Sequence, residues 1–436
     1  MRISVIGCGY LGAVHAASMA EMGHDVVGID VDEAKIAQLA AGEAPFFEPG
    51  LPEILRAGLA GGRLRFSTDF ADAATADVHF VAVGTPQVAD GDAADMRFVD
   101  AAFTSLLEYV KPGDLLVGKS TVPVGTAARL AMQIEAAVPG ATLVWNPEFL
   151  REGFAVQDTI TPDRLVYGVP DGEAGERAAR VLDKVYASPV SAGTPVIVAD
   201  YATAELVKVS ANAFLATKIS FINAMAEIAE ATGADVTKLA DAIGHDNRIG
   251  RRFLNAGVGF GGGCLPKDIR AFSARARELG KGEALAFLGE IDKINLRRRT
   301  RVVELVSEAL GGDVTGKRVA MLGLAFKPHS DDVRDSPALE VSLRLAEAGA
   351  LVVATDPQAI ERARMRAPHL TYEHSIRETL RGADVVVLLT EWPEFVGLDP
   401  AAIADLVGGK RIIDGRNSLD PVAWRDAGWE YRGLGR

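Results

Sequence analysis

Short apolar runs alternate with amphipathic stretches near both ends of the chain. Runs of strand length stand at 3–6, 25–30, 78–83, 115–119 and 143–145, and again at 318–322, 351–355, 384–389 and 411–414. A helical pattern from Ala13 to Met22 separates the first two runs. Strands that alternate with helices favour parallel sheets covered on both faces. The pattern therefore predicts an α/β fold with two doubly wound parallel sheets.

Between these two halves, from about Tyr201, the pattern changes to long helices. The stretch 204–232 carries apolar residues at spacings of mostly three and four, which predicts a buried helix: Leu206, Val209, Phe214, Ile219, Ile222, Met225 and Ile228. Two more helices are expected at 266–279 and 283–310, the second about 40 Å long. Such a helix suggests a spine between two lobes and a subunit interface. We therefore expect domains at 1–200, 201–310 and 311–436.

The second of these helices carries a basic cluster, Arg297-Arg298-Arg299 with Arg301. A solvated helix face explains those charges better than a phosphate site does.

The first strand runs into the turn Gly7-Cys8-Gly9-Tyr10-Leu11-Gly12, which opens the first helix. A GxGxxG motif is weak evidence alone, but here it lies between a strand and a helix, and Asp30 ends the next strand. Gly7 would allow the tight turn, Gly9 the approach of a pyrophosphate, and Gly12 close packing of helix and strand. Asp30 would accept hydrogen bonds from a ribose diol and repel a 2′-phosphate. The motif predicts a Rossmann-like domain that binds NAD rather than NADP, with Cys8 as a small packing residue.

Composition excludes several classes of protein. The chain has 436 residues, 48% of them hydrophobic and 24% charged, which is typical of a globular protein of two or three domains. A formal net charge of -13 argues against a nucleic-acid scaffold. The two cysteines form no disulfide framework, so we expect a reducing cytoplasm, and no apolar run is long enough to predict a membrane span. No metal site is expected.

The stretch 257–268, GVGFGGGCLPKD, concentrates the candidate chemistry. Five glycines within 257–263 suggest backbone that takes positive φ or lies against a ligand. Cys264 follows directly, with Lys267 and Asp268 beside it. Because a nearby cation or helix N-terminus lowers the pKa of a thiol, Cys264 is a candidate nucleophile. The alternative is a pliable loop with a small buried cysteine.

Other polar clusters follow predicted strands, where α/β sheets bind their ligands. They are 84–86, 120–123 and 146–152 in the first half, and 323–336 and Arg416 in the last. On the expected helix 204–232, Lys208 and Asn212 lie one turn apart. The alternative for this pair is a solvated helix face.

Taken in order, GxGxxG, VGTP (83–86), KSTVPVGT (119–126), NPEFLREG (146–153), GFGGGCLPKD (259–268) and FKP (326–328) resemble the UDP-glucose/GDP-mannose dehydrogenase family over essentially the whole chain. The resemblance implies a homodimer with an NAD domain, a helical dimerising middle and a C-terminal domain that holds the UDP end of a UDP-sugar substrate. It also implies oxidation of a primary alcohol to a carboxylic acid with two NAD, through a thioester on the cysteine.

The resemblance also assigns roles. Cys264 would be the nucleophile and Asp268 an acid/base group acting with a water, while Lys208 and Asn212 would stabilise oxyanionic intermediates. Thr121 and Glu148 would position water. The cofactor would meet Gly7, Gly9, Gly12, Asp30, Lys35, Thr85, Thr121, Glu152, Lys267 and Arg334. The substrate would meet Glu148, Phe149, Leu150, Arg151, Glu152, Lys208, Asn212, Arg248, Phe253, Leu254, Asn255, Ala256, Gly257, Gly261, Lys327 and Arg416.

One position departs from the family pattern, since Gly263 stands where many relatives carry serine, and we expect little effect beyond a looser loop. Three questions stay open at this point. The substrate could be a different sugar nucleotide of the family, such as GDP-mannose or a UDP-N-acetylhexosamine. The group that removes the first proton could be a lysine, an aspartate or an ordered water. A rival from another class is an NAD-binding sensor without catalysis.

Overall fold

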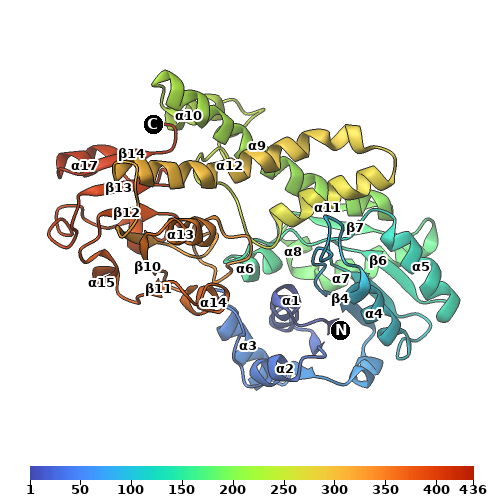
Figure 1. The fold of residues 1–436 in the computed structure, drawn as a ribbon. Coiled ribbons are helices and arrows are strands. Elements are labelled where there is room, and N and C mark those ends of the chain that lie inside the picture. The colour runs from blue at the N-terminus through green and yellow to red at the C-terminus, as the bar shows by residue number, and fades with distance from the viewer. The chain divides into compact units, whose positions relative to one another are not determined.

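The computed structural model describes residues 1–436, and its contacts divide the chain into two compact units. The first comprises Met1–Ala211 and Ala274–Leu279, and the second Asn212–Ser273 and Gly280–Arg436. Helices α9 (Tyr201–Thr232) and α11 (Leu265–Glu278) contribute residues to both units. Each unit contains one sheet (Figure 1). The predicted α/β fold with two sheets and long helices in the middle of the chain is confirmed.

The sheet of the first unit has eight strands in the order β3-β2-β1-β4-β5-β6-β7-β8. They are β1 (Arg2–Ile6), β2 (Asp25–Ile29), β3 (Leu64–Ser67), β4 (Val78–Val81), β5 (Leu115–Gly118), β6 (Thr142–Trp145), β7 (Leu165–Gly168) and β8 (Val196–Ala199). All neighbours pair in parallel except β6 and β7, which are antiparallel, so the sheet is mixed rather than wholly parallel. The strand order reverses between β1 and β4, and ligands bind at such a point in open α/β sheets.

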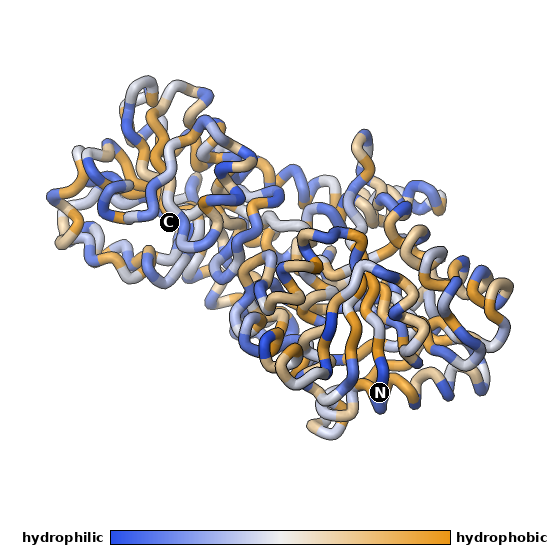
Figure 2. Tube along the Cα trace, turned by 90° about the horizontal axis from the view of Figure 1, so that it is seen from below, coloured by the Kyte–Doolittle hydropathy of each residue, from blue (hydrophilic) through white to orange (hydrophobic).

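Helices cover both faces of this sheet, so its central strands are buried on both sides. Side chains alternate between faces along a strand. Val78 and Phe80 of β4 therefore belong to one hydrophobic cluster and Val81 to the other. The apolar stretches of the strands near the N-terminus are visible in Figure 2. The helices of this unit are α1 (Tyr10–Glu21), α2 (Glu33–Ala40), α3 (Leu51–Ala60), α4 (Arg97–Leu107), α5 (Thr126–Ala137), α6 (Ala155–Ile160), α7 (Glu173–Val185) and α8 (Ala187–Ser191), with a 3₁₀ turn at Phe70–Thr75.

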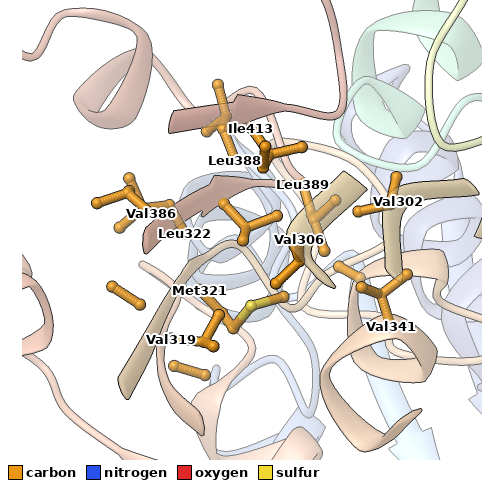
Figure 3. Packing of buried hydrophobic residues seen from close by; sticks show 14 of the residues in the cluster. Val302, Val306, Val319, Met321, Leu322, Val341, Val386, Leu388, Leu389 and Ile413 are labelled. Atoms are coloured by element: carbon orange, nitrogen blue, oxygen red, sulfur yellow. The ribbon is translucent and has the colours of Figure 1, made fainter. Parts of the chain in front are cut away.

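The sheet of the second unit has six parallel strands in the order β11-β10-β9-β12-β13-β14. They are β9 (Arg318–Leu322), β10 (Leu351–Thr355), β11 (Thr371–Tyr372), β12 (Val385–Leu388), β13 (Arg411–Asp414) and β14 (Glu430–Gly433). Its helices are α10 (Val236–Gly244), α12 (Ala286–Ala309), α13 (Pro337–Glu347), α14 (Ile360–Arg366), α15 (Ile376–Leu380), α16 (Pro393–Val396) and α17 (Pro421–Asp426). Val302 and Val306 of α12 pack against this sheet in one core with Met321 and Leu389 (Figure 3).

Helix α12 corrects two expectations. The predicted helix 283–310 is a 3₁₀ turn at Gly282–Leu285 followed by a shorter α-helix. The predicted solvated face holds for Arg297, which is exposed, but is wrong for Arg298 and Arg299, which are 1% exposed. Carboxylates compensate their charge inside the unit: Arg298 pairs with Glu230 at 2.9 Å, and Arg299 pairs with Asp335 at 2.8 Å. Sequence spacing could not show these partners, since they lie far away along the chain.

Helix α9 is less completely buried than its apolar pattern predicts. Phe214, Phe221 and Ile228 are 65%, 46% and 58% exposed, and they recur every seven residues. We call these three residues the apolar stripe. Leu206 is exposed as well. No helix in the chain combines the length and the apolar character needed to cross a membrane.

Candidate active site

The turn after β1 has the geometry that its three glycines predict. Gly7 has φ 88°, and a Cβ there would lie 2.6 Å from a methyl carbon of Val83. A Cβ on Gly12 would lie 1.7 Å from the carbonyl oxygen of Gly7, whereas one on Gly9 would meet nothing within 4 Å. Helix α1 has no acid in its first turn and no side-chain cap. Its N-terminal N–H groups and dipole therefore suit a pyrophosphate, and the turn fits NAD.

Asp30 is fixed beside this turn. Its carboxylate accepts a hydrogen bond of 2.7 Å from the backbone N–H of Cys8 and pairs with Lys35 at 2.9 Å. The adjacent Cys8 is fully buried, and burial raises the pKa of its thiol. The prediction that Cys8 is a packing residue is confirmed.

Lys208 and Glu148 form a buried ion pair in the first unit. The Lys208 Nζ lies 3.0 Å from Glu148 Oε1, and the two side chains are 6% and 13% exposed. The backbone N–H of Leu150 donates to the other oxygen of Glu148 at 2.6 Å, and the Lys208 ammonium lies 5.6 Å from the ring centre of Phe149. The alternative of a solvated helix face is wrong for Lys208. The first unit thus brings together four residues predicted to meet the substrate.

The predicted threonines lie at neighbouring strand ends of the same unit. Thr85, after β4, donates its hydroxyl to the carbonyl oxygen of Thr121, after β5, at 2.8 Å. Thr121 itself is half-buried.

In the second unit, Asp268 is held between an amide and an ammonium. Asn212 Nδ2 donates to Asp268 Oδ2, and Lys267 Nζ to Asp268 Oδ1, each at 2.6 Å. Asp268 is 2% exposed and Asn212 is 8% exposed, so Asn212 is not on a solvated face either. Cys264 is exposed and directly precedes α11, whose N-terminus favours a thiolate. An exposed thiol and a buried, paired carboxylate therefore lie one helical turn apart.

The glycine loop packs against its own unit. A Cβ on Gly261 would lie 2.2 Å from the carbonyl oxygen of Asp335, and Gly262 has φ 84° with the Phe326 ring 2.7 Å from a Cβ. Gly259 has φ 98°. The positive φ predicted for part of this loop is confirmed at Gly259 and Gly262, and the close contacts of Gly261 and Gly262 also require glycine. Packing within the protein is therefore sufficient to account for glycine at these positions, without contact with a ligand.

The departure at Gly263 lies beside the end of the Arg334 side chain. A Cβ on Gly263 would lie 2.4 Å from the guanidinium carbon of Arg334, which pairs with Asp332 at 2.7 Å. A serine at 263 would therefore require the Arg334 side chain to move.

Arg416 is used by the protein itself. Its three guanidinium nitrogens donate to the carbonyl oxygens of Leu389, Gly259 and Phe326 at 2.7, 2.9 and 2.9 Å. It thereby ties the glycine loop to the loop after β9. Lys327 on that loop has its ammonium 5.4 Å from the ring centre of Phe326.

The remaining substrate candidates belong to both units. In the first unit Arg151 pairs with Asp158, and Glu152 follows it. In the second unit, Arg248 is 89% exposed and pairs with Asp246. Phe253 has φ 67° and Leu254 is buried. The next three candidates make hydrogen bonds within the unit: Asn255 accepts from Arg251, Ala256 accepts from Asn417, and Gly257 donates to Asn223. The charge of Arg248 is thus paired with a neighbour on its own loop rather than with another of these candidates.

Sequence reasoning missed three buried polar residues that brace these loops. Glu48 accepts from the backbone N–H groups of Gly153 and Ala155 at 2.7 Å each. Asn295 of α12 exchanges hydrogen bonds with the backbone of Phe260. Lys119 entered only as the last residue of the predicted strand 115–119 and the first residue of the motif 119–126. A charged residue directly after a wholly apolar strand was the one available signal for Lys119.

The structure contains no group of three or more His, Cys, Asp or Glu side chains that is arranged to hold a metal ion.

Comparisons with known proteins agree with this geometry. Three family models match in order: the NAD binding domain of the UDP-glucose/GDP-mannose dehydrogenase family at 1–188, its central domain at 202–297 and its UDP binding domain at 320–421. A UDP-glucose 6-dehydrogenase of Bacillus subtilis is 41% identical over all of this chain and 98% of its own length, and one of Rhizobium meliloti is 40% identical over the full length of both.

Solved structures give the same result. A UDP-glucose dehydrogenase from Pyrobaculum islandicum is 39% identical with a TM-score of 0.89, covering all of this chain and 97% of that one. A UDP-D-ManNAc dehydrogenase from Pyrococcus horikoshii is 28% identical with a TM-score of 0.86, covering 100% and 99%. This chain therefore belongs to the UDP-glucose/GDP-mannose dehydrogenase family, whose members are NAD-dependent enzymes.

Proposed function

We propose that this chain is a UDP-glucose 6-dehydrogenase that oxidises UDP-glucose to UDP-glucuronate through a thioester on Cys264. The observation that carries the proposal is the exposed Cys264 at the N-terminus of α11 with the buried, doubly paired Asp268 one turn later. Relatives named UDP-glucose 6-dehydrogenase that align over the full length support the choice of sugar.

The cysteine solves a chemical problem. NAD, when bound, supplies the acceptor for one hydride in each of two oxidations. Loss of a hydride and a proton from the primary alcohol gives an aldehyde, whose remaining C–H hydrogen does not leave as a hydride in the free form because an acylium ion would result. The Cys264 thiolate adds to the aldehyde carbon, and the oxygen takes a proton, which gives a thiohemiacetal. That carbon can release a second hydride as the hydroxyl loses its proton, leaving a thioester. Water then breaks the C–S bond and releases the acid and the thiol.

The two buried charge clusters suit different steps of this sequence. Asp268 would exchange protons through a water, with Asn212 and Lys267 holding its orientation. The ammonium of Lys208 would stabilise negative charge on the reacting oxygen. Glu148 and Thr121 would position the hydrolytic water, with Glu148 as its base. The first proton acceptor stays open among a lysine, an aspartate and a water.

We propose that three domains divide the ligand-binding work. Residues 1–200 would hold NAD, with the pyrophosphate at Gly9 and the ribose at Asp30. Residues 201–310 would carry Cys264 and dimerise, and residues 311–436 would hold the UDP end, with Lys327 as its cation.

We also propose that the enzyme acts in the cytoplasm, since neither cysteine belongs to a disulfide framework.

The apolar stripe on α9 supports a homodimer. Its three side chains repeat every seven residues, as along the seam of a packed helix pair, and would otherwise face water.

A substrate panel tests the proposal. UDP-glucose, GDP-mannose and UDP-N-acetylhexosamines are supplied separately with NAD, and both NADH and the sugar product are quantified. We expect turnover of UDP-glucose with two NADH for each UDP-glucuronate. Turnover of another sugar nucleotide in its place would refute the assigned substrate, and binding of NAD without any turnover would favour the sensor.

A further inference from the structure

Lys119 is a buried lysine whose hydrogen-bond partners are neutral. It directly follows β5 and is 6% exposed. Its Nζ donates to Asn146 Oδ1 at 3.0 Å, to the Asn146 carbonyl oxygen at 3.4 Å and to the Tyr186 hydroxyl at 3.3 Å. A buried ammonium without a carboxylate in its hydrogen-bond shell is costly to the fold. Such a group needs an explanation other than stability.

The same network fixes neighbouring strand ends. The Tyr186 hydroxyl donates to Asn146 Oδ1 at 2.7 Å, and Asn146 Nδ2 donates to the carbonyl oxygen of Val166 in β7 at 2.9 Å. The Lys119 ammonium also lies 5.8 Å from the ring centre of Phe80 in β4. The ends of β5 and β6 are thus held through one ammonium, and Glu148 stands two residues beyond Asn146.

Lys119 interacts by charge with the Glu148–Lys208 pair, attracting the carboxylate and repelling the ammonium. We propose that Lys119 is a positioning residue for this pair: it fixes the strand ends that carry Glu148 and places a buried positive charge that attracts the Glu148 carboxylate and repels the Lys208 ammonium. This inference rests on the proposed function, in which the pair serves the reaction. It needs no contact between Lys119 and the substrate.

The charge on Lys119 can be switched by pH. Burial lowers its pKa to about 8, an effect that Glu148 opposes and Lys208 reinforces. Two other titratable groups face it. Burial, reinforced by Lys119, lowers the pKa of His15, and burial raises the pKa of Tyr186, so both are neutral near pH 8. The positive charge is therefore present below about pH 8 and is lost above it.

The decisive experiment compares the pH profiles of kcat/KM for three variants. Lys119→Met removes the charge and its hydrogen bonds, Lys119→Arg keeps a charge that does not titrate, and Tyr186→Phe removes hydrogen bonds of the same network while keeping the lysine. In the wild-type enzyme and in Tyr186→Phe, we expect kcat/KM to fall as the pH rises through about 8, which gives the pH profile a limb there. We expect at least a tenfold loss at pH 7 and no such limb in Lys119→Met, and no limb below pH 9 in Lys119→Arg.

A wild-type limb in Lys119→Met would overturn the inference, as would equal losses in Lys119→Met and Tyr186→Phe. If Lys119→Met does not fold, the pH profile of Lys119→Arg is the test. A fall of kcat/KM near pH 8 in Lys119→Arg would overturn the inference.

A readout without turnover separates this inference from the proposed function. Since the pKa of Lys119 is lowered in the folded state from its ordinary 10.5, the unfolded chain binds more protons between about pH 8 and 10.5. The Tm of the wild type relative to Lys119→Met should therefore rise with pH across that window. A Tm difference that does not change with pH would refute the inference that Lys119 carries a buried positive charge. Inactivity on every sugar nucleotide, together with the expected Tm change, refutes the proposed function and supports the buried charge.

Discussion

Replacing Arg299 by methionine tests how far the buried ion pairs of α12 stabilise the second unit. The Arg299 side chain is 2% exposed, its Nη1 lies 2.8 Å from Asp335 Oδ1, and it also pairs with Glu340. Its Nη2 donates to the carbonyl oxygens of Phe260 and Asp335 at 3.3 and 3.4 Å. Methionine keeps the apolar stem and removes every one of these contacts.

The structure sets the size of the effect. Removing one partner of a buried pair costs about 3–5 kcal/mol when the remaining charge is stranded. Here the remaining acids are partly rescued: Asp335 keeps Arg270 at 3.4 Å, and Glu340 is 38% exposed with Arg344 at 3.7 Å. We therefore expect a loss of about 2–3 kcal/mol in the free energy of unfolding, at or just below the low end of that range. For a unit of this size that loss lowers Tm by about 5–10 °C.

Differential scanning calorimetry of the full chain measures the shift. Arg297→Met is the matched control on the same helix, because Arg297 is 52% exposed and its pair with Glu227 spans 3.4 Å. An exposed pair of this kind is worth about 0–1 kcal/mol. If Arg299→Met lowers Tm by no more than the control does, the buried pairs are not a source of stability and the reasoning fails.

The proposed function makes four further predictions. Cys264→Ser should bind NAD and UDP-glucose but form no UDP-glucuronate in the steady state, so product chromatography showing wild-type turnover would exclude the thioester. Lys327→Ala should raise the KM for UDP-glucose by about tenfold or more, as expected for the loss of a charged hydrogen bond, with NAD affinity unchanged; an unaltered KM would remove Lys327 from the UDP site. The wild-type enzyme should prefer NAD, and Asp30→Asn should narrow that preference in initial-rate assays with NAD and NADP; equal wild-type rates with both would contradict the role of Asp30. Phe221→Asp should yield monomers in analytical ultracentrifugation, whereas Val422→Asp, which changes a 61% exposed valine on α17, should not; a dimer that survives Phe221→Asp would argue against the stripe.

Local patterns in the sequence were sufficient for much of the fold. Every predicted strand is present within two residues of its predicted ends, because a short apolar run bounded by turn residues has few other stable states. The turn at Gly7, Gly9 and Gly12 was predictable in detail, since each glycine answers a separate local requirement. The short strands β3, β7, β8, β11 and β14 were missed, as was the antiparallel pairing of β6 with β7. Pairing direction depends on how distant segments meet.

The stretch 257–268 shows the limit most clearly. The sequence alone determined that a thiol follows a glycine-rich loop and opens a helix with Lys267 and Asp268. The three-dimensional packing showed that the glycines contact Asp335 and Phe326, and that Asn212 donates a hydrogen bond to Asp268. Burial decided the rest: Arg298 and Arg299 lie inside the protein, Lys119 has neutral partners, and Phe214 faces outward. The cost of burying a charge depends on which distant groups compensate it, and the order of residues along the chain does not contain that information.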